Sequence, residues 1–375
     1  MKIKKIGIEC GSIEDEKHLW GVGKMIIGLL QEISHRPELE LEKNFRFVLY
    51  FKDIIPDFSF LNSPIFEKKL IPVPFFKGRL FPIYYFALLP VKLWFERLDW
   101  MFWPNYMLPI IAPGKSIVML TEDVYYETHE GKLPFRYRLA YGIFASWTAK
   151  FATKILAISE TSKKNIAKLY KINSDRIFVN YPGVDVPSNS QPKVDNKNPY
   201  ILYVGQMFPR RHAKETIIAY EKIASDFPDL KLIMVGPDKY PTPTIDLMIS
   251  DINKKLSREA VVHKNYISNE ELVQLYANAK ALIYISDREA FGLPPMEALS
   301  YGVPPVIMDN ELGHELFGDY AFYVANPDLE GITEAIRQSL TNSGKIKRIN
   351  DVGSEFVKKY NWKNFTDKFL NVIQK

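Results

Sequence analysis

The chain of 375 residues is long enough for two domains of ordinary size. Apolar residues make up 47% and charged residues 25%, a balance that excludes a disordered chain. The 49 basic and 44 acidic residues leave a charge of +5, too small and too dispersed to predict nucleic-acid binding. The single cysteine, Cys10, cannot form an internal disulfide, which is typical of a reducing cytoplasm.

The N-terminus begins like a signal peptide, with lysines at positions 2, 4 and 5. Its apolar stretch ends at Cys10 and acidic residues follow from Glu14, which predicts that the chain is not exported. The segment Leu80–Trp103 is interrupted by prolines and charges well short of the ~20 clean residues of a membrane-spanning helix. We therefore predict a cytoplasmic protein without a transmembrane helix.

In the first half of the chain, short β-rich runs alternate with helical periods. Between the first two runs, apolar residues from Val22 to Ile33 keep the spacing of a buried helix face. Such alternation is typical of a parallel α/β sheet with helical crossovers. We predict strands at Lys5–Cys10, Phe45–Phe51, Trp100–Trp103, Ser116–Thr121, Lys154–Ser159 and Arg176–Tyr181. Residues 1–183 are thus expected to form one doubly wound, Rossmann-like domain.

Residues 184–198 are rich in Asp, Pro, Ser, Asn and Lys, which predicts an interdomain linker. The alternation then restarts over residues 199–353 and predicts a second doubly wound domain. Its predicted strands are Tyr200–Gly205, Lys231–Gly236, Ala260–His263, Lys280–Ser286, Val303–Met308 and Ala321–Val324, with helices near 213–224, 244–257, 269–278, 294–302 and 328–341. A helical tail follows over 354–375. Two such domains facing each other would place the carboxyl ends of both sheets around one cleft.

The most informative turn, Asp287–Ala298, directly follows a predicted buried strand. Gly292 permits a tight turn, and Pro294 suits the first turn of a helix because its missing N–H is not needed there. Such a helix N-terminus favours phosphate. Glu289 and Glu297 bracket it, and carboxylates suit hydroxyl groups because they accept hydrogen bonds. A solvated loop residue and a helix-dipole partner are equally compatible with these two positions.

A second turn, which begins at Gly205, contains Arg210 and Arg211. Guanidinium forks neutralise phosphate oxygens bidentately. A solvated surface cluster is the competing interpretation, since most charge clusters are of that kind. The position directly after a predicted strand favours the functional interpretation.

Two candidate groups lie in the first predicted domain. Gly21, Gly23 and Lys24 open its first helix, where they could approach a phosphate closely. A lone Gly-x-Gly is more often a flexible turn. Glu122 and Asp123 follow a predicted strand at its carboxyl end. An N-cap with a solvated neighbour explains that pair as well as function does.

Other chemistries have little support in the sequence. Asp287-Arg288-Glu289 is like the Asp-x-Asp metal motif of some sugar transferases, but no second ligand group accompanies it. The six histidines show no metal-binding spacing. Nucleophile elbow, P-loop and Gly-x-Gly-x-x-Gly motifs are missing from the sequence, which argues against hydrolases, nucleoside triphosphatases and dinucleotide enzymes. We predict no metal site and no cofactor.

In combination, these turns resemble those of the retaining glycosyltransferases of family 4, which have the GT-B fold of two facing Rossmann-like domains. Glu289 and Glu297 match the family's E-x7-E element. The further matching segments are Gly21–Lys24, Leu156–Glu160, Asn180–Asp185, Tyr203–Gly205, Pro209–His212 and Tyr301–Pro304. The resemblance covers nearly the whole chain.

The resemblance implies transfer of a sugar from a nucleoside diphosphate donor to an acceptor hydroxyl, with retention of configuration and without a metal. It implies front-face attack, with the departing phosphate taking the acceptor proton. It places the donor on the second domain and returns the tail 354–375 to the first. Its implied donor contacts are Arg210, Arg211 and the amides of Phe291, Gly292 and Leu293 at the diphosphate, Glu297 at the ribose and Glu289 at the sugar.

Two positions depart from the family pattern. Arg211 replaces a lysine and preserves the charge, whereas Glu122 precedes Asp123 where the family has a histidine near the donor sugar. The second change leaves two classes of function open: an enzyme of altered specificity or weak catalysis, and a non-catalytic subunit that binds sugar nucleotides. Glu289, Glu297 and the arginines favour the enzyme. A nucleotide-sugar epimerase is a weaker alternative.

The donor and acceptor are less well determined. The run Trp103–Pro109 resembles family members that use GDP-mannose, while rhamnose, glucose and galactose donors stay open. The segment Phe75–Trp103 is rich in aromatic and basic residues, which suits a membrane interface and a lipid-linked or other glycan acceptor. Ordinary amphipathic core helices explain that segment equally well.

Overall fold

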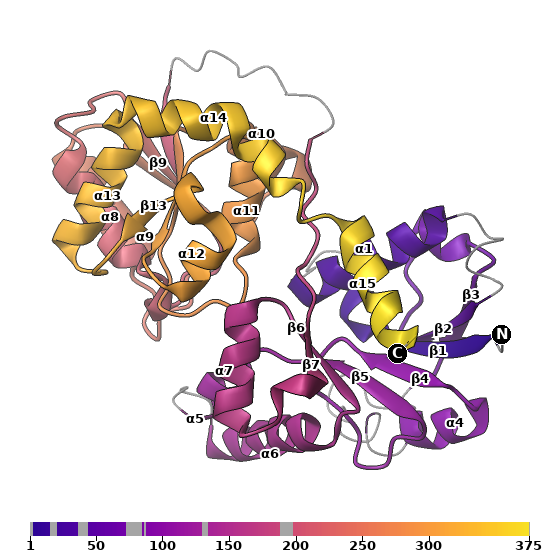
Figure 1. Ribbon diagram of the computed structural model, residues 1–375. Helices are drawn as coiled ribbons and strands as arrows, with labels where there is room; N and C mark the ends of the chain where they lie inside the picture. The colour runs from indigo at the N-terminus through magenta and orange to yellow at the C-terminus, as the bar shows by residue number, and fades with distance from the viewer. Residues whose placement is uncertain are drawn as a thin grey trace. The chain divides into compact units, whose positions relative to one another are not determined.

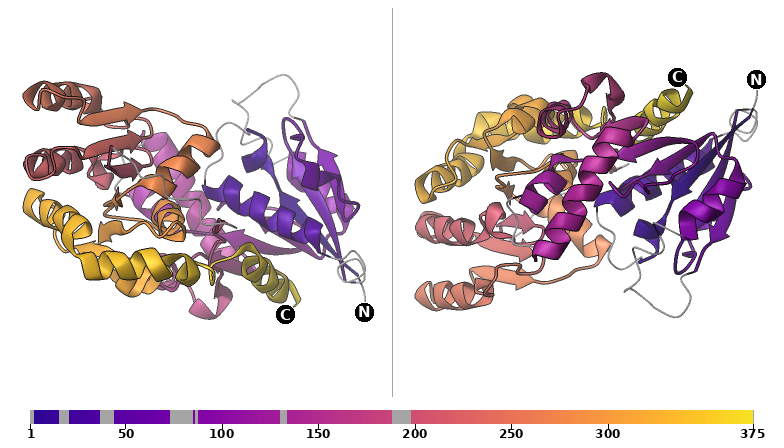
Figure 2. Two further views of the ribbon diagram at one scale, coloured as in Figure 1. Left: turned by 90° about the horizontal axis from the view of Figure 1, so that it is seen from above. Right: turned by 90° about the horizontal axis from the view of Figure 1, so that it is seen from below.

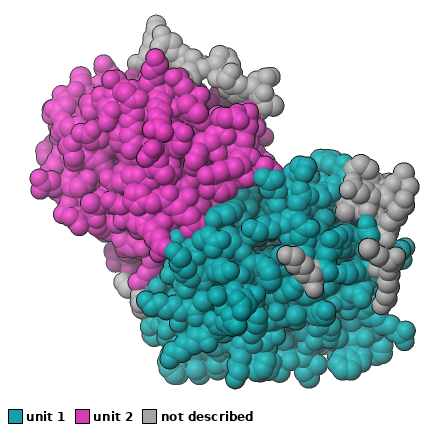
Figure 3. Space-filling model, viewed as in Figure 1, with its two compact units in different colours: residues 1–183, 362–375 teal, residues 184–361 magenta. Residues whose placement is uncertain are grey.

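The computed structural model describes residues 3–15, 21–36, 44–72, 85, 88–129, 134–187 and 198–374. The chain divides into two compact units (Figure 1, Figure 3). Unit 1 comprises residues 1–183 and 362–375, and unit 2 comprises residues 184–361. Each unit is a parallel sheet with helices, so the predicted fold class is confirmed.

Unit 1 has a sheet of seven parallel strands among its described residues, in the order β3-β2-β1-β4-β5-β6-β7. Buried apolar runs form most of them, as expected of a parallel sheet covered on both faces. The strands are β1 (Lys4–Glu9), β2 (Phe45–Phe51), β3 (Phe66–Leu70), β4 (Trp100–Trp103), β5 (Lys115–Met119), β6 (Lys154–Ala157) and β7 (Ile177–Val179). The sequence pattern did not predict β3, because this edge strand carries three charged residues in five.

Helices lie on both faces of this sheet (Figure 2). α1 and α15 pack together on one face, while α4, α6 and α7 pack on a core on the other face that includes Trp103 and Tyr50. The helices are α1 (Gly21–His35), α4 (Leu89–Glu96), α5 (Glu122–His129), α6 (Phe135–Phe151), α7 (Glu160–Tyr170) and α15 (Trp362–Gln374), with short 3-10 turns at Gly11–Ile13, Ser59–Asn62 and Ser174–Arg176.

The chain re-enters unit 1 at Trp362, whose indole packs on two glycines. An added Cβ at Gly28 would lie 2.2 Å from Trp362 Cδ2, and one at Gly183 would lie 2.4 Å from the same atom. Only glycine leaves room for the ring at either position. The preceding Tyr360 packs edge-on against Phe291 of unit 2, with ring centroids 5.7 Å apart. The returning segment therefore begins at residue 362, rather than at residue 354 as expected.

Unit 2 has a parallel sheet whose described strands run in the order β10-β9-β8-β11-β12-β13. The strands are β8 (Tyr200–Val204), β9 (Lys231–Val235), β10 (Val261–Lys264), β11 (Ala281–Tyr284), β12 (Pro305–Met308) and β13 (Phe322–Val324). The helices are α8 (Ala213–Ile223), α9 (Ile245–Lys255), α10 (Asn269–Asn278), α11 (Leu293–Ser300), α12 (Glu311–Phe317), α13 (Leu329–Thr341) and α14 (Ser343–Val357), with 3-10 turns at Pro209–Arg211 and Gly318–Tyr320.

Candidate functional site

The carboxyl ends of β8 and β9 meet through two glycines with positive φ. Gly205 has φ 134° and Gly236 has φ 128°, in the region that favours glycine. An added Cβ at Gly236 would lie 2.2 Å from the Gly205 carbonyl oxygen, and one at Gly205 would lie 2.6 Å from Arg211 Nη1. The two strand ends are thus in backbone contact, and the Arg211 guanidinium lies directly on Gly205.

Glu289, in the loop after β11, pairs with both arginines of the loop after β8. Its Oε1 lies 3.0 Å from Arg211 Nε, 2.8 Å from Arg211 Nη2 and 3.3 Å from Arg210 Nη1. The three side chains are 16–28% exposed, so solvent screens the cluster only in part. The structure therefore joins into one ion-paired cluster the groups that the sequence assigned separately to diphosphate and sugar.

The two arginines also lie on aromatic rings. The Arg211 guanidinium is 5.2 Å from the centroid of the Tyr284 ring, and that of Arg210 is 5.3 Å from the centroid of Phe208. Burial opposes the charge on Arg211, but its neighbours Tyr284 and Glu289 outweigh burial and raise the pKa of the guanidinium. Burial first, and then Glu289, raise the pKa of the Tyr284 phenol. Arg211 is therefore a permanent cation.

The loops after β8 and β11 are tied together at Asp287. Its backbone N–H donates to the Arg210 carbonyl (2.9 Å), and its Oδ1 lies 2.7 Å from His212 Nε2. His212 has φ 47°, a left-handed conformation, and its carbonyl accepts from Thr216 Oγ1 at 2.8 Å. These bonds fix the arginine-bearing loop to the start of the loop that carries Glu289.

Glu297 lies in the first turns of α11, which begins after Gly292 in a left-handed conformation with φ 82°. Pro294 and Pro295 occupy the first turn, where no N–H donor is needed. Tyr276 of α10 donates to Glu297 Oε2 at 2.9 Å. This bond orients the carboxylate beside the helix N-terminus.

The phenol of Tyr276 is fully buried and stacks on Tyr301, with centroids 6.1 Å apart and planes at 15°. Burial and then Glu297 raise the pKa of Tyr276, so the phenol stays protonated and remains a donor. At the helix N-terminus itself, Phe291 is buried, while Leu293 and Pro294 are half-buried. The donor residues expected on the second domain thus gather at one end of the unit 2 sheet.

The remaining predicted site residues belong to unit 1. Gly21 and Lys24 are exposed and Gly23 is buried in the first turn of α1. Asp123 is half-buried in α5. Glu122, the first residue of α5, is 3% exposed.

The carboxylate of Glu122 points into unit 1. Ser162 Oγ donates to Oε2, and Asn165 Nδ2 donates to Oε1 at 3.1 Å. Both donors belong to α7, so Glu122 holds the start of α5 against that helix. A buried, doubly hydrogen-bonded carboxylate stabilises packing, a role that the strand-end position alone did not suggest.

Glu9, which the sequence motifs did not single out, is a second buried carboxylate in unit 1. It ends β1 and is 1% exposed. Burial raises its pKa to about 7, the largest effect, and hydrogen bonds from Gly11 and Tyr85 oppose the rise. A charged residue at the end of the apolar run Ile6–Ile8 is the sequence signal that could have identified it.

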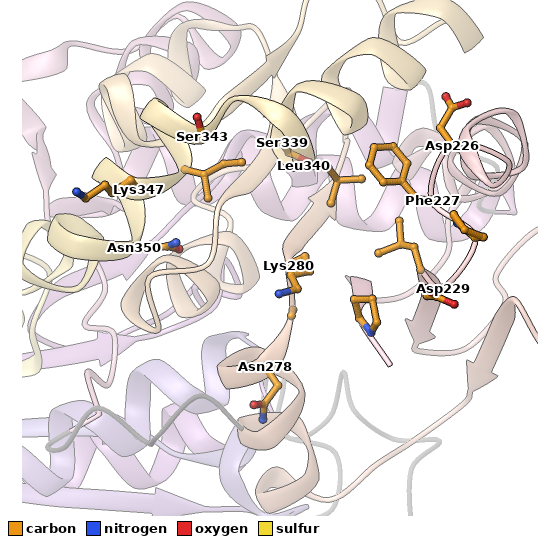
Figure 4. Close-up of a pocket in the computed structure, with 15 residues that line it drawn as sticks. Asp226, Phe227, Asp229, Asn278, Lys280, Ser339, Leu340, Ser343, Lys347 and Asn350 are labelled. Carbon is orange, nitrogen blue, oxygen red and sulfur yellow. The ribbon is translucent and has the colours of Figure 1, made fainter. Parts of the chain in front are cut away.

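A cavity of about 860 Å³ lies elsewhere in unit 2 (Figure 4). Pro199, Leu230 and Lys280, which precede β8, β9 and β11, line it at the amino ends of these strands. Gly205 and Glu289 lie at the carboxyl ends, so the cavity is not part of the arginine cluster. Within the described ranges, no group of three or more His, Cys, Asp or Glu side chains is placed to hold a metal ion.

Comparisons with known proteins point to one family. The family model described as Glycosyl transferases group 1 matches residues 187–356. O-antigen chain mannosyltransferase RfbU of Salmonella typhimurium is 29% identical over 261 residues, 69% of this chain and 69% of RfbU. O-antigen chain mannosyltransferase B of Escherichia coli is 28% identical over 238 residues, which cover 60% of this chain and 61% of that relative.

A solved structure shares the whole fold. The crystal structure of Anabaena Alr3699/HepE in complex with UDP-glucose matches with a TM-score of 0.70, covering 99% of both chains at 15% identity. Identity at that level establishes the fold alone. The two-unit architecture is therefore one that is known to occur in a complex with a nucleotide sugar.

Proposed function

We propose that the chain is a group 1 glycosyltransferase of the GT-B fold, and that it transfers mannose from a nucleoside diphosphate sugar to a glycan hydroxyl. The observation that carries the proposal is the cluster of Arg210, Arg211 and Glu289 beside the N-terminus of α11. The cluster and the helix end lie at the carboxyl ends of β8 and β11, where open α/β sheets bind ligands.

The arginines neutralise the diphosphate of the donor. Charge on the departing phosphate grows as the sugar leaves, so fixed cations at that position stabilise the transition state more than the ground state. Glu289 holds both guanidinium groups in place before the donor binds. Since the two arginines supply the positive charge, we expect activity to persist in excess EDTA.

The remaining donor contacts follow from the same geometry. The amides of Phe291, Gly292 and Leu293 lie at the N-terminus of α11, which attracts phosphate through its partial positive charge. Glu297, oriented by Tyr276, accepts hydrogen bonds from the ribose hydroxyls. Glu289 accepts from a sugar hydroxyl.

The proposed transfer needs no separate general base. The bond between the anomeric carbon and the phosphate oxygen breaks, and a bond from the acceptor oxygen to the same carbon forms on the same face. The acceptor proton passes to the departing phosphate oxygen. Configuration is then retained, and a nuclear magnetic resonance spectrum of the glycoside formed from GDP-mannose should show the α-anomer.

Mannose is favoured by the names of the two curated relatives, both mannosyltransferases. The Anabaena structure contains UDP-glucose, so nucleotide choice needs a direct test. A thermal-shift panel of GDP, UDP, dTDP and ADP supplies it, because a ligand that binds the native state raises the melting temperature. We expect GDP to give the largest rise. A larger rise with UDP would overturn the GDP-mannose assignment.

We propose that unit 1 meets the acceptor at a membrane surface, through the outer faces of α4 and α6. On α6, Phe135 is 77% exposed, Leu139 52% and Ile143 60%, although an outward helix face is normally polar. On α4, Trp94 is 62% exposed and Phe95 is 78% exposed. Both helices pack on the same core and lie on the same face of the sheet (Figure 2).

Charge favours an anionic lipid as the partner of this surface. The helix α6 contains no acidic residue, and Lys150 on it is exposed. Lys92 and Arg97, in and beside α4, are exposed as well. Much of the segment Phe75–Trp103, expected at a membrane, lies outside the described residues. No helix in the described part of the chain is long and apolar enough to cross a bilayer.

Vesicle sedimentation tests this contact at the cytoplasmic face of the membrane. Wild type should bind vesicles of phosphatidylethanolamine and phosphatidylglycerol better than vesicles of phosphatidylcholine. Leu139→Asp should reduce the bound fraction at least fivefold, whereas Leu247→Asp, at a residue of unit 2 that is 67% exposed, should not. Equal losses in both variants would overturn the assignment of the surface.

The non-catalytic alternative keeps one observation in its favour, the buried Glu122 at the position where the family has a histidine. Release of GDP from GDP-mannose, with octyl α-mannoside as a surrogate acceptor, separates the two functions. The proposed enzyme releases GDP and glycosylates the octyl mannoside. Tight GDP binding with no release from any nucleotide sugar would favour the binding subunit.

A further inference from the structure

The carboxylate of Glu9 joins three separate segments of unit 1. Its Oε1 accepts from the Gly11 N–H at 2.9 Å and from the Tyr85 hydroxyl at 3.0 Å. Its Oε2 accepts from Asn105 Nδ2 at 3.2 Å, and Asn105 Oδ1 in turn accepts from the Met107 N–H at 3.0 Å. One side chain therefore links the turn after β1, Tyr85 and the loop after β4.

These segments meet at the carboxyl ends of β1 and β4, which are neighbours in the sheet. An added Cβ at Gly11 would lie 2.6 Å from Glu9 Oε1, so the turn after β1 wraps closely around the carboxylate. The Tyr85 ring lies 6.5 Å from the Trp103 ring, centroid to centroid. Glu9 thus organises the edge of the sheet at which α/β proteins bind ligands.

Burial of a carboxylate at this position is energetically unfavourable. Among the residues that the structure describes, the hydrogen-bond partners of Glu9 are all neutral donors, and no ion pair with them offsets the desolvation of its carboxylate. The charged groups that act on it are Glu14 and Lys52, with opposite effects on its pKa, and the titratable side chains Tyr85 and Cys10 lie beside it. An apolar residue would stabilise the core without this desolvation penalty, which points to a functional reason for Glu9.

We propose that Glu9 is a positioning residue for the acceptor, holding Asn105 and Tyr85 in the arrangement that the acceptor meets on unit 1. This inference rests on the proposed function, in which unit 2 binds the donor. The run Trp103–Pro109 resembles family members that use GDP-mannose, which suggested a role in donor selection. Because the side chain of Asn105 bonds within unit 1, we assign this run to acceptor selection instead.

The chemistry of the network identifies the informative variant. The side-chain amide of Asn105 cannot flip without losing the hydrogen bond that its Oδ1 accepts from the Met107 N–H. Its NH2 group must therefore face residue 9. Gly11 presents an N–H as well. A glutamine at position 9 has only one side-chain oxygen to accept from these two donors. In Glu9→Gln, its NH2 group must therefore face either the Gly11 N–H or the Asn105 NH2 group, and that pair of donors cannot form a hydrogen bond.

Kinetics with GDP-mannose and octyl α-mannoside test the proposal. Glu9→Gln and Asn105→Ala should each raise the acceptor KM at least fivefold, with the donor KM and GDP affinity unchanged. Acceptor kcat/KM of wild type should rise from pH 6 to pH 8 with an inflection near 7, because the ionised carboxylate makes all three bonds. That inflection should vanish in Glu9→Gln and persist in Glu127→Gln, a change at an exposed residue of α5.

Hydrogen exchange at the Met107 amide gives a readout independent of turnover. It should be faster in Glu9→Gln than in wild type and unchanged in Glu127→Gln. An unchanged acceptor KM in folded Glu9→Gln, or a rise in the donor KM instead, would overturn the positioning role. If wild type cleaves no nucleotide sugar, the proposed function is wrong. Unchanged hydrogen exchange at the Met107 amide in Glu9→Gln would contradict the positioning role of Glu9 independently of that result.

Discussion

Arg211 contacts a single carboxylate oxygen of Glu289 with two nitrogens, Nε at 3.0 Å and Nη2 at 2.8 Å. Arg210 lies 3.3 Å from the same oxygen. The second oxygen of a carboxylate can still accept bonds when one oxygen takes several. Glu289 therefore prearranges the cations, and its remaining accepting capacity is shared with the hydrogen bond from the Tyr284 phenol.

Removing either arginine should affect turnover more than donor binding. In Arg210→Ala and Arg211→Ala, the lost charge matters most when the phosphate departs, so kcat should fall at least 100-fold, about 2.7 kcal/mol, with a smaller change in donor KM. Steady-state kinetics with variable GDP-mannose provide the measurement. Arg348→Ala, at a residue whose side chain is 53% exposed, is the control. A rise in the donor KM with kcat unchanged would instead indicate ordinary ground-state binding.

Glu297→Ala should weaken GDP binding by about 1–3 kcal/mol, the range for losing hydrogen bonds to a charged group. Tyr276→Phe removes only the phenol that orients Glu297, so it should weaken binding by about 1 kcal/mol. Calorimetry with GDP measures both values. If affinity in folded Glu297→Ala equals that of wild type, the assignment of Glu297 to the ribose is wrong.

Glu122→Gln tests the residue at which the chain departs from the pattern of the family that it resembles. Ser162 and Asn165 both donate to Glu122, and Gln offers only one accepting oxygen, so we expect a loss of about 1–3 kcal/mol of unfolding free energy. Chemical denaturation reports this loss, with Glu127→Gln as the control. A tenfold fall in turnover with unchanged stability would instead support a catalytic role beside the donor sugar.

Glu9 should make stability depend on pH in a defined direction. Burial raises its folded pKa to about 7 from an ordinary value of 4.5, so the neutral acid favours folding. Its stabilising contribution is complete below about pH 4.5 and is lost as pH rises to about 7. The unfolding free energy of wild type relative to Glu9→Met should therefore fall by up to about 3 kcal/mol over that interval. A flat difference would contradict the raised pKa.

The sequence by itself determined the fold class and many of its elements. The strands Phe45–Phe51 and Trp100–Trp103 were predicted with their observed bounds, because strands buried on both faces are continuous apolar runs. The turn at Gly292 was also predicted correctly, because a glycine followed closely by Pro294 and Pro295 is a local signal for the start of a helix. The edge strand β3 escaped prediction because its exposed charges hide the strand pattern.

Only the tertiary structure decided which polar groups meet. Arg211 and Glu289 are 78 residues apart and Glu9 and Asn105 are 96 apart, and no local pattern encodes either pairing. The same holds for Glu122, whose partners lie on another helix. Local propensity acts over a few residues, whereas a buried carboxylate takes whichever donors the packing of distant segments brings within about 3 Å.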